Sequence, residues 1–497
     1  MTVDLSTANA IEAFDLLVTA EEAFAAFEDA VLAAEHSVVG CFRVFDLRTK
    51  LRGASARKIG DTWFDLILHA LNRGVAFSLT VTDFDPIIAT EDHRRSWSSA
   101  RQFAAVNELS TDARFTWTIA DHPARVGLIP RVALQAKSRP EMNATAEDPL
   151  TPGLADRKSR MDLPLIPATH HQKLAVIDNR SLYIGGLDLN ERRYDTKDHA
   201  LPAEQTWHDI QAVVEGPVVA AALRHLDSFQ AVTAGQRPAT ASAPGFLRTL
   251  SMKRSAEVLH FGPKDHVAEI EKAHLDAIAE TVGPIYFETQ FFRHKPLAEA
   301  LAKAARTKPQ LTCTMVLPAS PEDVAFEGNR REDAQFGAQL QMECIDIVAE
   351  AFGNRLSLAS PARPAVAPTD SSRYSTLFDA PIVYVHSKVS LFGAQQAIVS
   401  SANLNGRSLR WDTEAGVHLV DPDHVQTLWH RVLSHWLGRH PIDPLEDQTT
   451  FIHWLNGALA QNIATPPEER SHFLLPYPRG RDIELASPLP GVPDEMV

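Results

Sequence analysis

Two distant stretches of the chain each place a histidine two residues before a lysine. The pairs are His171 with Lys173 and His386 with Lys388. Each pair opens an apolar run that predicts a β-strand, and on a strand residues i and i+2 face the same side, about 6.5 Å apart. Each stretch therefore presents an imidazole beside an ammonium group. An imidazole can attack phosphorus or transfer a proton, and lysines can neutralise phosphate oxygens.

The residues that follow each pair also repeat. A turn and a second strand are predicted, then small residues that include Gly186 in the first stretch and Ser401 in the second. Asp188 and Asn403 stand at the same offset from their respective histidines. The hairpin would return these polar residues to the His-Lys pair, and the small residues would leave room for a ligand. If two such halves pack face to face, two imidazoles oppose each other across one phosphate pocket.

These stretches resemble the phospholipase D superfamily, whose signature H-x-K-x-x-x-x-D occurs twice in a chain. The first copy here is complete and ends at Asp178, whereas Gly393 stands at the aspartate position of the second. We interpret both as turn residues, because Gly serves a turn as well as Asp does. The resemblance covers roughly residues 20–440. It includes stretches similar to eukaryotic-type phospholipases D at residues 82–89, 192–199, 206–217 and 285–292.

The resemblance implies a role for each matching residue. His171 would form a phosphohistidine, and His386 would act first as general acid and then as base for an incoming water or alcohol. Lys173, Lys388 and Asn403 would hold phosphate oxygens. Asp188, Gly186 and Ser401 would also border the substrate. By motif position, Glu414 would orient His171 and Asp209 would orient His386, each from the opposite half.

No metal or other cofactor is expected, because carboxylates and histidines show no metal-ligand spacing in the sequence. The three cysteines, Cys41, Cys313 and Cys344, lie in apolar surroundings and are expected to be buried and reduced. His170 and His208 are expected to be structural, and Phe291 and Phe292 to belong to the core. Trp207 and Trp411 remain open between a structural and a functional role.

The elements that must position these residues alternate between helix and strand. Helical spacing of Phe24, Phe27 and Val31 precedes a predicted strand at 37–45, a helix at 61–73 and a strand at 75–85. The order restarts with a helix at 265–282, a strand at 283–292, a helix at 295–306 and a strand at 310–318. This indicates an internal duplication in an α/β protein.

The resemblance implies two similar α/β halves related by a pseudo-twofold axis, each with a mixed sheet flanked by helices, and an active site at their interface. We expect an N-terminal half at 1–235, a C-terminal half at 247–440 and an extension at 441–497 with a Pro-rich irregular tail from 466. Residues 233–246 are predicted as a linker. Residues 137–169 are predicted as a long loop that could act as a lid.

The composition narrows the function. The chain has 497 residues and a formal net charge of −15, which disfavours a general nucleic-acid binder because backbone affinity comes mainly from Lys and Arg. No secretory signal or membrane-spanning run is visible. We therefore expect a cytoplasmic protein, or one exported without a cleaved signal. It would visit a membrane surface transiently to reach a phospholipid, and a monomer is plausible.

The leading hypothesis is metal-independent hydrolysis of a glycerophospholipid to phosphatidic acid and a free headgroup alcohol, with transfer to another alcohol also open. Rival interpretations are a nuclease or a cardiolipin synthase-like transferase of the same superfamily. A further rival is a catalytically weakened membrane-binding effector, which the Gly393 position prompts.

Overall fold

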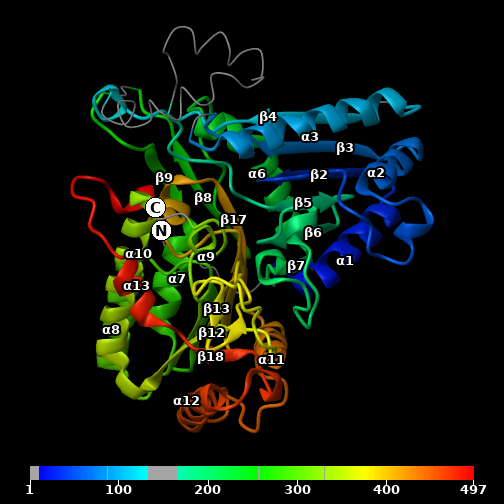
Figure 1. The fold of residues 1–497 in the computed structure, drawn as a ribbon. Coiled ribbons are helices and arrows are strands. Elements are labelled where there is room, and N and C mark those ends of the chain that lie inside the picture. Colours follow the sequence, from blue (N-terminus) through cyan, green and yellow to red (C-terminus); the bar gives the residue numbers. More distant parts are fainter. Residues whose placement is uncertain (1–9, 87, 113, 133–164, 256–257, 329–330) are drawn as a thin grey trace.

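The computed structural model describes residues 10–86, 88–112, 114–132, 165–255, 258–328 and 331–497. Within them the chain builds two large mixed β-sheets, each flanked by helices (Figure 1). Most of the loop predicted at 137–169, and with it the proposed lid, lies outside the described residues. The remainder, from Leu165, leads directly to His171.

The first sheet has seven strands in the order β1-β7-β6-β5-β2-β3-β4. β2, β3 and β4 run parallel, and the other pairings are antiparallel. The strands are β1 (Ala13–Val18), β2 (Ser37–Phe42), β3 (Ala76–Thr82), β4 (Phe115–Ala120), β5 (Leu174–Ile177), β6 (Ser181–Gly185) and β7 (Ile210–Glu215). The helices of this part are α1 (Thr19–Ala33), α2 (Trp63–Asn72), α3 (Thr90–Leu109) and α6 (Val218–Thr233).

The second sheet has nine strands in the order β18-β12-β11-β10-β15-β16-β17-β8-β9. They are β8 (Phe246–Met252), β9 (Lys264–Ala268), β10 (Ile285–Thr289), β11 (Cys313–Val316), β12 (Leu356–Pro361), β15 (Lys388–Phe392), β16 (Gln396–Ser400), β17 (Glu414–Leu419) and β18 (Leu474–Pro476). A separate short hairpin joins β13 (Thr376–Leu377) to β14 (Ala380–Pro381). The helices are α7 (Glu269–Glu280), α8 (Lys295–Thr307), α9 (Glu322–Phe326), α10 (Glu332–Phe352), α11 (Pro422–Leu437), α12 (Gln448–Ala464) and α13 (Arg479–Leu485).

The two sheets share one strand order. Read as β8-β17-β16-β15-β10-β11-β12, the second sheet repeats the order of all seven strands of the first, and β9 and β18 are additions at its edges. The hairpin β5-β6 thus corresponds to β15-β16, the two segments that follow the His-Lys pairs. The predicted fold class, two similar α/β halves with mixed sheets, is confirmed. The boundaries at 235, 247 and 440 stay a prediction.

Two local predictions differ from the structure. The helix expected from residue 265 begins only at Glu269, because residues 264–268 form β9 and pair with β8. The tail expected to be irregular from 466 contains β18, which pairs with β12 at the edge of the sheet and whose Leu474 and Leu475 are buried. In both places hydrogen bonding to a sheet edge overrides a weak local pattern.

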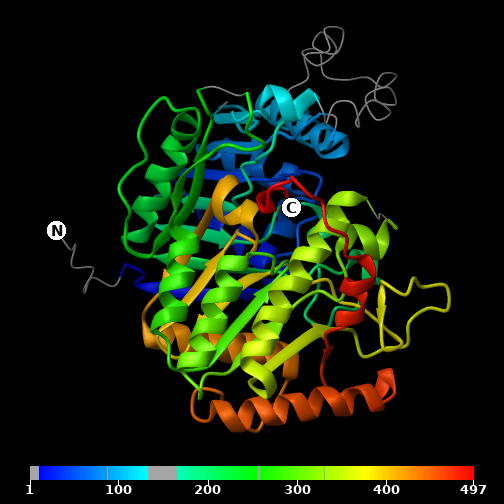
Figure 2. The ribbon, with the colours of Figure 1, turned by 90° about the vertical axis from the view of Figure 1, so that its left-hand side faces the viewer.

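The halves join through a shared hydrophobic core. Leu182 and Ile184 of β6 belong to the same buried cluster as Val399 of β16 and Val417 of β17. In the perpendicular view, α12 runs along one end of the molecule, beneath the second sheet (Figure 2). Among the described helices, none combines the length and apolarity that crossing a bilayer requires. The two hairpins that carry the His-Lys pairs are thus held against each other at the centre.

Candidate active site

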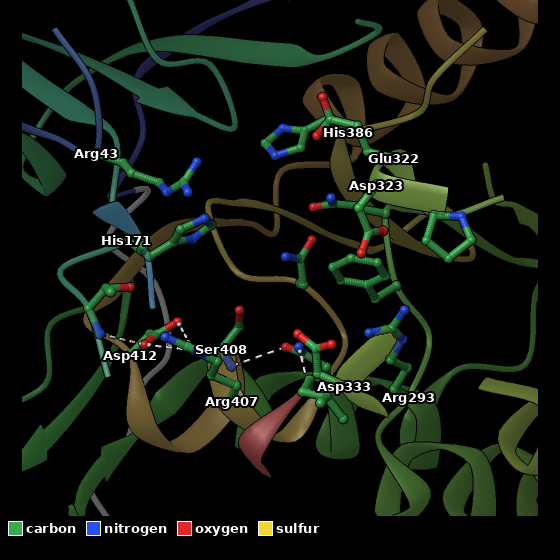
Figure 3. A pocket seen from close by; sticks show the side chains of 18 of the residues that line it. Arg43, His171, Arg293, Glu322, Asp323, Asp333, His386, Arg407, Ser408 and Asp412 are labelled. Atoms are coloured by element: carbon green, nitrogen blue, oxygen red, sulfur yellow. Dashed lines mark hydrogen bonds and ion pairs between the residues drawn. The ribbon is translucent and has the colours of Figure 1, made fainter. Parts of the chain in front are cut away.

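A cavity of about 430 Å³ lies where the two halves meet. Its walls include both His171 and His386, whose rings approach it from different elements (Figure 3). His171 lies three residues before the start of β5, and His386 lies two residues before the start of β15. The structure therefore brings the two predicted histidines to one cavity, although more than two hundred residues separate them in the sequence.

A pair of cross-half bridges positions the two histidines in equivalent ways. His170 forms a parallel bridge with Thr413, and His208 forms one with Val385. The backbone N–H of His171 donates to the carbonyl of Thr413 at 2.9 Å, and that of His386 donates to the carbonyl of His208 at 2.8 Å. Each bridge is followed at once by a histidine in one half and an acidic residue in the other.

The acidic residues after the bridges meet the imidazoles. Nδ1 of His171 lies 2.8 Å from Oε1 of Glu414, and Nδ1 of His386 lies 2.6 Å from Oδ2 of Asp209. Because Nδ1 faces a carboxyl group in both cases, Nε2 is the nitrogen left for the cavity. The sequence-predicted pairs thus have the geometry of an imidazole oriented by an acid from the opposite half.

Burial and the lysines set the protonation of this cluster. Burial and, next, the charge of Lys173 lower the pKa of His171 well below its usual range, and burial and Lys388 do the same to the pKa of His386. Burial raises the pKa of Glu414 to about 8 and also raises that of Asp209. In the free protein the imidazoles are therefore neutral, and a neutral imidazole is the form that can attack phosphorus.

The two lysines stand behind the histidines. Nζ of Lys173 donates to the carbonyl of His171 at 2.5 Å, and Nζ of Lys388 donates to the carbonyl of His386. Burial lowers the pKa of Lys173 and lowers that of Lys388 to about 7. Neither Lys173 nor Lys388 belongs to the cavity wall as described.

The small residues after the hairpins contact the carboxyl groups instead of lining the cavity. A Cβ on Gly186 would lie 2.1 Å from Oδ1 of Asp209, so only glycine leaves space for that carboxyl group. At the equivalent position, Oγ of Ser401 donates to Oε2 of Glu414. The structure thus places Gly186 and Ser401 beside the acids that face the histidines. Neither belongs to the described cavity wall, where the resemblance implied that they would border the substrate.

The equivalent polar residues Asp188 and Asn403 have different surroundings. Asn403 lines the cavity, and its buried Oδ1 has no hydrogen-bond partner among the described residues. Asp188 is buried outside the wall, where Oδ1 accepts the backbone N–H of Val44 at 2.9 Å. Its charge also opposes the loss of the proton from Lys173. Asp188 therefore stabilises the lysine and the end of β2.

The last motif positions, Asp178 and Gly393, lie at the hairpin turns. Asp178 has φ 52° and Gly393 has φ 57°, so both turns use the left-handed region. The Asp178 carboxylate accepts three backbone N–H groups at 2.8 Å, from residues 35, 36 and 37. Gly393 packs against Gly283 and accepts Nε1–H of Trp429 at 2.8 Å. These contacts agree with the interpretation of both as turn residues.

Several cavity residues carry no signal in the sequence spacing. Arg43, Arg193 and Arg407 bring guanidinium groups to the wall. The guanidinium of Arg193 lies 3.3 Å from the centre of the Trp207 ring, and its buried Nε and Nη1 have no hydrogen-bond partner among the described residues. The Trp207 ring lies 4.7 Å from that of His386. Arg43 follows the end of β2, Arg193 ends a 3-10 turn and Arg407 begins a π-helical turn. Only the fold brings these segments together.

The structural roles expected for several aromatic residues and for His170 agree with the structure in some cases and differ in others. Phe292 is buried in the core as expected, but Phe291 lines the cavity with Arg293 stacked 3.8 Å from its ring centre, so its assignment to the core was wrong. His170 is structural as expected, with Nδ1 2.8 Å from Oγ1 of Thr413. Trp207 lines the cavity and Trp411 does not belong to the described wall.

The wall of the cavity carries charges of both signs. Figure 3 shows Glu322, Asp323 and Asp333 across the cavity from Arg43 and His171, with Asp412 on the side of His171 and Arg293 on the side of Asp333. The cavity therefore offers both cationic and anionic side chains to a bound molecule.

Parts of this chain are similar in sequence to known proteins. No protein-family model matches it. Phospholipase D alpha 1 of Carica papaya is 22% identical over 52% of this chain and 46% of its own length, and phospholipase D1 of Schizosaccharomyces pombe is 23% identical over 51% and 25%. The chain thus spans less than half the length of these relatives.

The fold has a match among solved structures. The crystal structure of phosphatidylserine synthase from Haemophilus influenzae Rd KW20 covers 91% of this chain and 94% of its own, with a TM-score of 0.53 and 11% identity. The sequence matches and the shared architecture agree with each other. The chain is a distant homologue of the phospholipases D and has the fold of their superfamily.

Proposed function

We propose that the protein is a phospholipase D that cleaves a glycerophospholipid to phosphatidic acid and a free headgroup alcohol. The observation that carries the proposal is the shared cavity in which His171 and His386 each face an acid of the opposite half. Distant homology to phospholipases D supports a phosphodiester substrate. The lipid, the headgroup and a transient visit to a membrane surface are parts of this proposal.

In the first step, Nε2 of His171 attacks phosphorus while the bond from phosphorus to the headgroup oxygen breaks. His386, protonated at Nε2, gives that proton to the leaving oxygen. In the second step, neutral His386 takes a proton from water, the water oxygen attacks phosphorus and the bond from phosphorus to His171 breaks. The proton returns to His386, so the cycle closes without a metal in either step.

A bound substrate would favour the protonated form of His386, which burial disfavours in the free protein. Burial and Lys388 lower the pKa of His386 in the free protein, whereas general-acid catalysis needs its protonated form. A phosphodiester anion in the cavity opposes this shift because it places a negative charge beside the imidazole. Lys173, Lys388 and Arg193 would neutralise the additional charge on the phosphorus oxygens in the transition state.

The opposite wall suggests the headgroup. Glu322, Asp323 and Asp333 lie across the cavity from Arg43 and His171. A headgroup with an amine or quaternary ammonium would place its cation on that side while the phosphate stays at the histidines. We therefore favour choline and ethanolamine phospholipids over phosphatidylglycerol.

The primary test uses purified protein with vesicles of phosphatidylcholine, phosphatidylethanolamine or phosphatidylglycerol, with and without a chelator. Release of headgroup and phosphatidic acid is followed, with plasmid and single-stranded DNA in parallel reactions. We expect lipid cleavage that His171→Ala and His386→Ala each lower by several orders of magnitude. If the protein cleaves DNA and no lipid, the nuclease interpretation replaces the proposal. If it cleaves none of the substrates, the effector interpretation is favoured.

A second test assigns the two histidines separately. A phosphodiester with a p-nitrophenol leaving group departs without a proton donor. His386→Asn should therefore release about one nitrophenolate per chain and stop at a phosphohistidine, which mass spectrometry after rapid quenching would locate at His171. His171→Asn should give neither the burst nor the adduct. An adduct on another residue would contradict the assignment.

A further inference from the structure

Three histidines form a cluster behind His386, outside the wall of the cavity. His199 follows the loop after β6, His208 precedes β7, and His435 lies on α11. One ring nitrogen from each lies within 4.8 Å of those of the other two, and the Nε2 atoms of His199 and His435 are 3.0 Å apart. His199 and His208 are buried, whereas His435 is partly exposed and leaves an approach from solvent.

Carboxylates fix the tautomers of the two buried rings. Nδ1 of His199 lies 2.7 Å from Oδ2 of Asp195, and Nε2 of His208 lies 2.8 Å from Oε1 of Glu288. The proton of each neutral ring is therefore on the carboxylate side, and a lone pair remains on Nε2 of His199 and on Nδ1 of His208. A carboxylate behind a histidine in this way is the usual support of a metal ligand.

Other donors hold the carboxylates in place. Glu288 accepts hydrogen bonds from the Tyr286 hydroxyl at 2.6 Å, from Nε1 of Trp436 at 2.7 Å and from the hydroxyl of Ser387. Asp195 accepts the backbone N–H of Trp207 at 3.1 Å. With these acceptors already occupied, the carboxylates stay oriented toward the imidazole N–H groups.

Hydrogen bonding alone does not satisfy the cluster. Nε2–H of His435 can donate to Nε2 of His199, which satisfies one lone pair. Nδ1 of His208 remains buried and has no hydrogen-bond partner among the described residues. An unpaired polar atom in the interior is destabilising, so an occupant of the cluster is favoured.

We propose that Nε2 of His199, Nδ1 of His208 and Nε2 of His435 bind a zinc ion, with a water as the fourth ligand. Zn–N bonds of about 2.0–2.1 Å in tetrahedral geometry place three imidazole ring centres about 5 Å from one another. The observed separations are 5.5 Å for 199–208, 5.1 Å for 199–435 and 4.7 Å for 208–435. The spacing of the three rings is therefore compatible with one shared zinc ion.

The protonation of the rings agrees with this assignment. Burial lowers the pKa of His199 and lowers the pKa of His435 well below its usual range. Both rings are therefore neutral near neutral pH, and neutral imidazole is the ligand form. Zinc suits a site of three imidazoles, while oxygen-preferring Mg²⁺ and Ca²⁺ do not.

The ion would stabilise the active site without touching the substrate. His208 is followed directly by Asp209, and Ser387, which binds Glu288, directly follows His386. The three histidines are absent from the described cavity wall. Zinc would thus join α11 to the loop that leads to Asp209 and would fix the cross-half bridge of His208 with Val385. The assignment is independent of the proposed lipase reaction.

The test measures zinc in the full chain, purified without a polyhistidine tag. Elemental mass spectrometry should find about one zinc per chain in the wild type and at least about tenfold less in His435→Gln. His430→Gln is the matched control, because His430 is exposed on the same helix. Equal zinc in the wild type and in His435→Gln would overturn the site, as would a wild type without zinc that takes up none when zinc sulfate is added.

A second measurement covers the case in which His435→Gln folds poorly. Asp195→Asn keeps the shape of the side chain that supports His199 and should weaken zinc binding by about 10- to 100-fold. Zinc added to chelator-stripped protein should raise the Tm of the wild type and of His430→Gln, and much less that of Asp195→Asn. Co²⁺ in place of zinc should give the intense visible absorption of a tetrahedral site. Equal Tm shifts in all three proteins, or no such absorption, would contradict the proposal.

Discussion

Oδ2 of Asp209 lies 2.6 Å from Nδ1 of His386, 177 residues later in the chain, and Oε1 of Glu414 lies 2.8 Å from Nδ1 of His171, 243 residues earlier. Each contact crosses between the halves in the opposite direction. Both depend on a parallel backbone bridge directly before the pair. Neither half therefore holds a complete histidine-acid pair, and the two acids can be tested separately.

Glu414→Gln and Asp209→Asn should each lower kcat by about 10²- to 10⁴-fold, because an amide no longer stabilises the imidazole charge or the productive tautomer. A substrate whose leaving group needs no proton distinguishes the two variants. With a p-nitrophenyl phosphodiester the leaving group needs no proton, so the first-step burst should largely recover in Asp209→Asn but stay slow in Glu414→Gln. Equal burst rates in the two variants would contradict the division of roles.

Gly186→Ala should lower kcat by about 10²-fold or more, because the new Cβ would lie 2.1 Å from Oδ1 of Asp209 and must displace it. Steady-state kinetics with a short-chain phospholipid measures the loss. Gly457→Ala is the control, since a Cβ there meets nothing within 4 Å and the helix should gain about 1 kcal/mol. Wild-type kcat in Gly186→Ala would show that the position of Asp209 does not matter.

The pH dependence of kcat/KM should report Lys388. Burial lowers its pKa to about 7, below the ordinary lysine value, so the ammonium charge is present below that pH and is lost as the pH rises through it. Affinity for an anionic phosphodiester should fall on the alkaline side. In Lys388→Arg the side chain stays charged, so the alkaline decline should move to higher pH. The same decline in both proteins would assign it to another group.

Asp178→Ala should lower the free energy of unfolding by about 2 kcal/mol, because three backbone N–H groups lose a charged acceptor. Although partial burial opposes it, these same donors lower the pKa of the carboxyl group. Urea unfolding measures the loss, and kcat of the folded protein should stay at the wild-type value. A large fall in kcat at unchanged stability would give Asp178 a role in the reaction.

Gly393→Asp restores the superfamily signature in the second half and should leave kcat unchanged. The φ of 57° is tolerated by Asp, and the new Cβ would lie 3.2 Å from Oγ1 of Thr281, which costs about 1 kcal/mol or less in stability. Lipid hydrolysis and thermal unfolding measure the two effects. A large gain in kcat would instead show that Gly393 weakens the natural enzyme.

Local patterns in the sequence predicted much of this arrangement. The equal offsets after His171 and His386 indicated two equivalent hairpins, and the structure gives both sheets one strand order. The pairings of Glu414 and Asp209 followed from motif position and correspond to hydrogen bonds. Gly186 and Ser401 contact those acids instead of the cavity, because a strand pattern fixes which face a residue is on but not its neighbour across the sheet.

What the sequence could not supply comes from contacts between distant segments. Arg193 reaches the cavity from a single 3-10 turn at residues 191–193, and Trp207 reaches it from a loop before β7. His199, His208 and His435 have no metal-ligand spacing along the chain, yet three different elements bring their ring nitrogens together. The expectation of no metal rested on spacing alone. Tertiary packing, which spacing does not encode, decides such clusters.

Each half supplies the acid that contacts the histidine of the other half, and this arrangement bears on how such a chain could arise. A single copy of this unit would carry a histidine without its orienting acid, so an ancestor of that kind could function only as a symmetric pair of subunits. After fusion into one polypeptide, the two copies can carry different residues at equivalent positions. Gly186 beside Asp209 and Ser401 beside Glu414 occupy equivalent places with different chemistry. The two equivalent positions thus accommodate their acids in different ways, one by leaving space and one by a hydrogen bond.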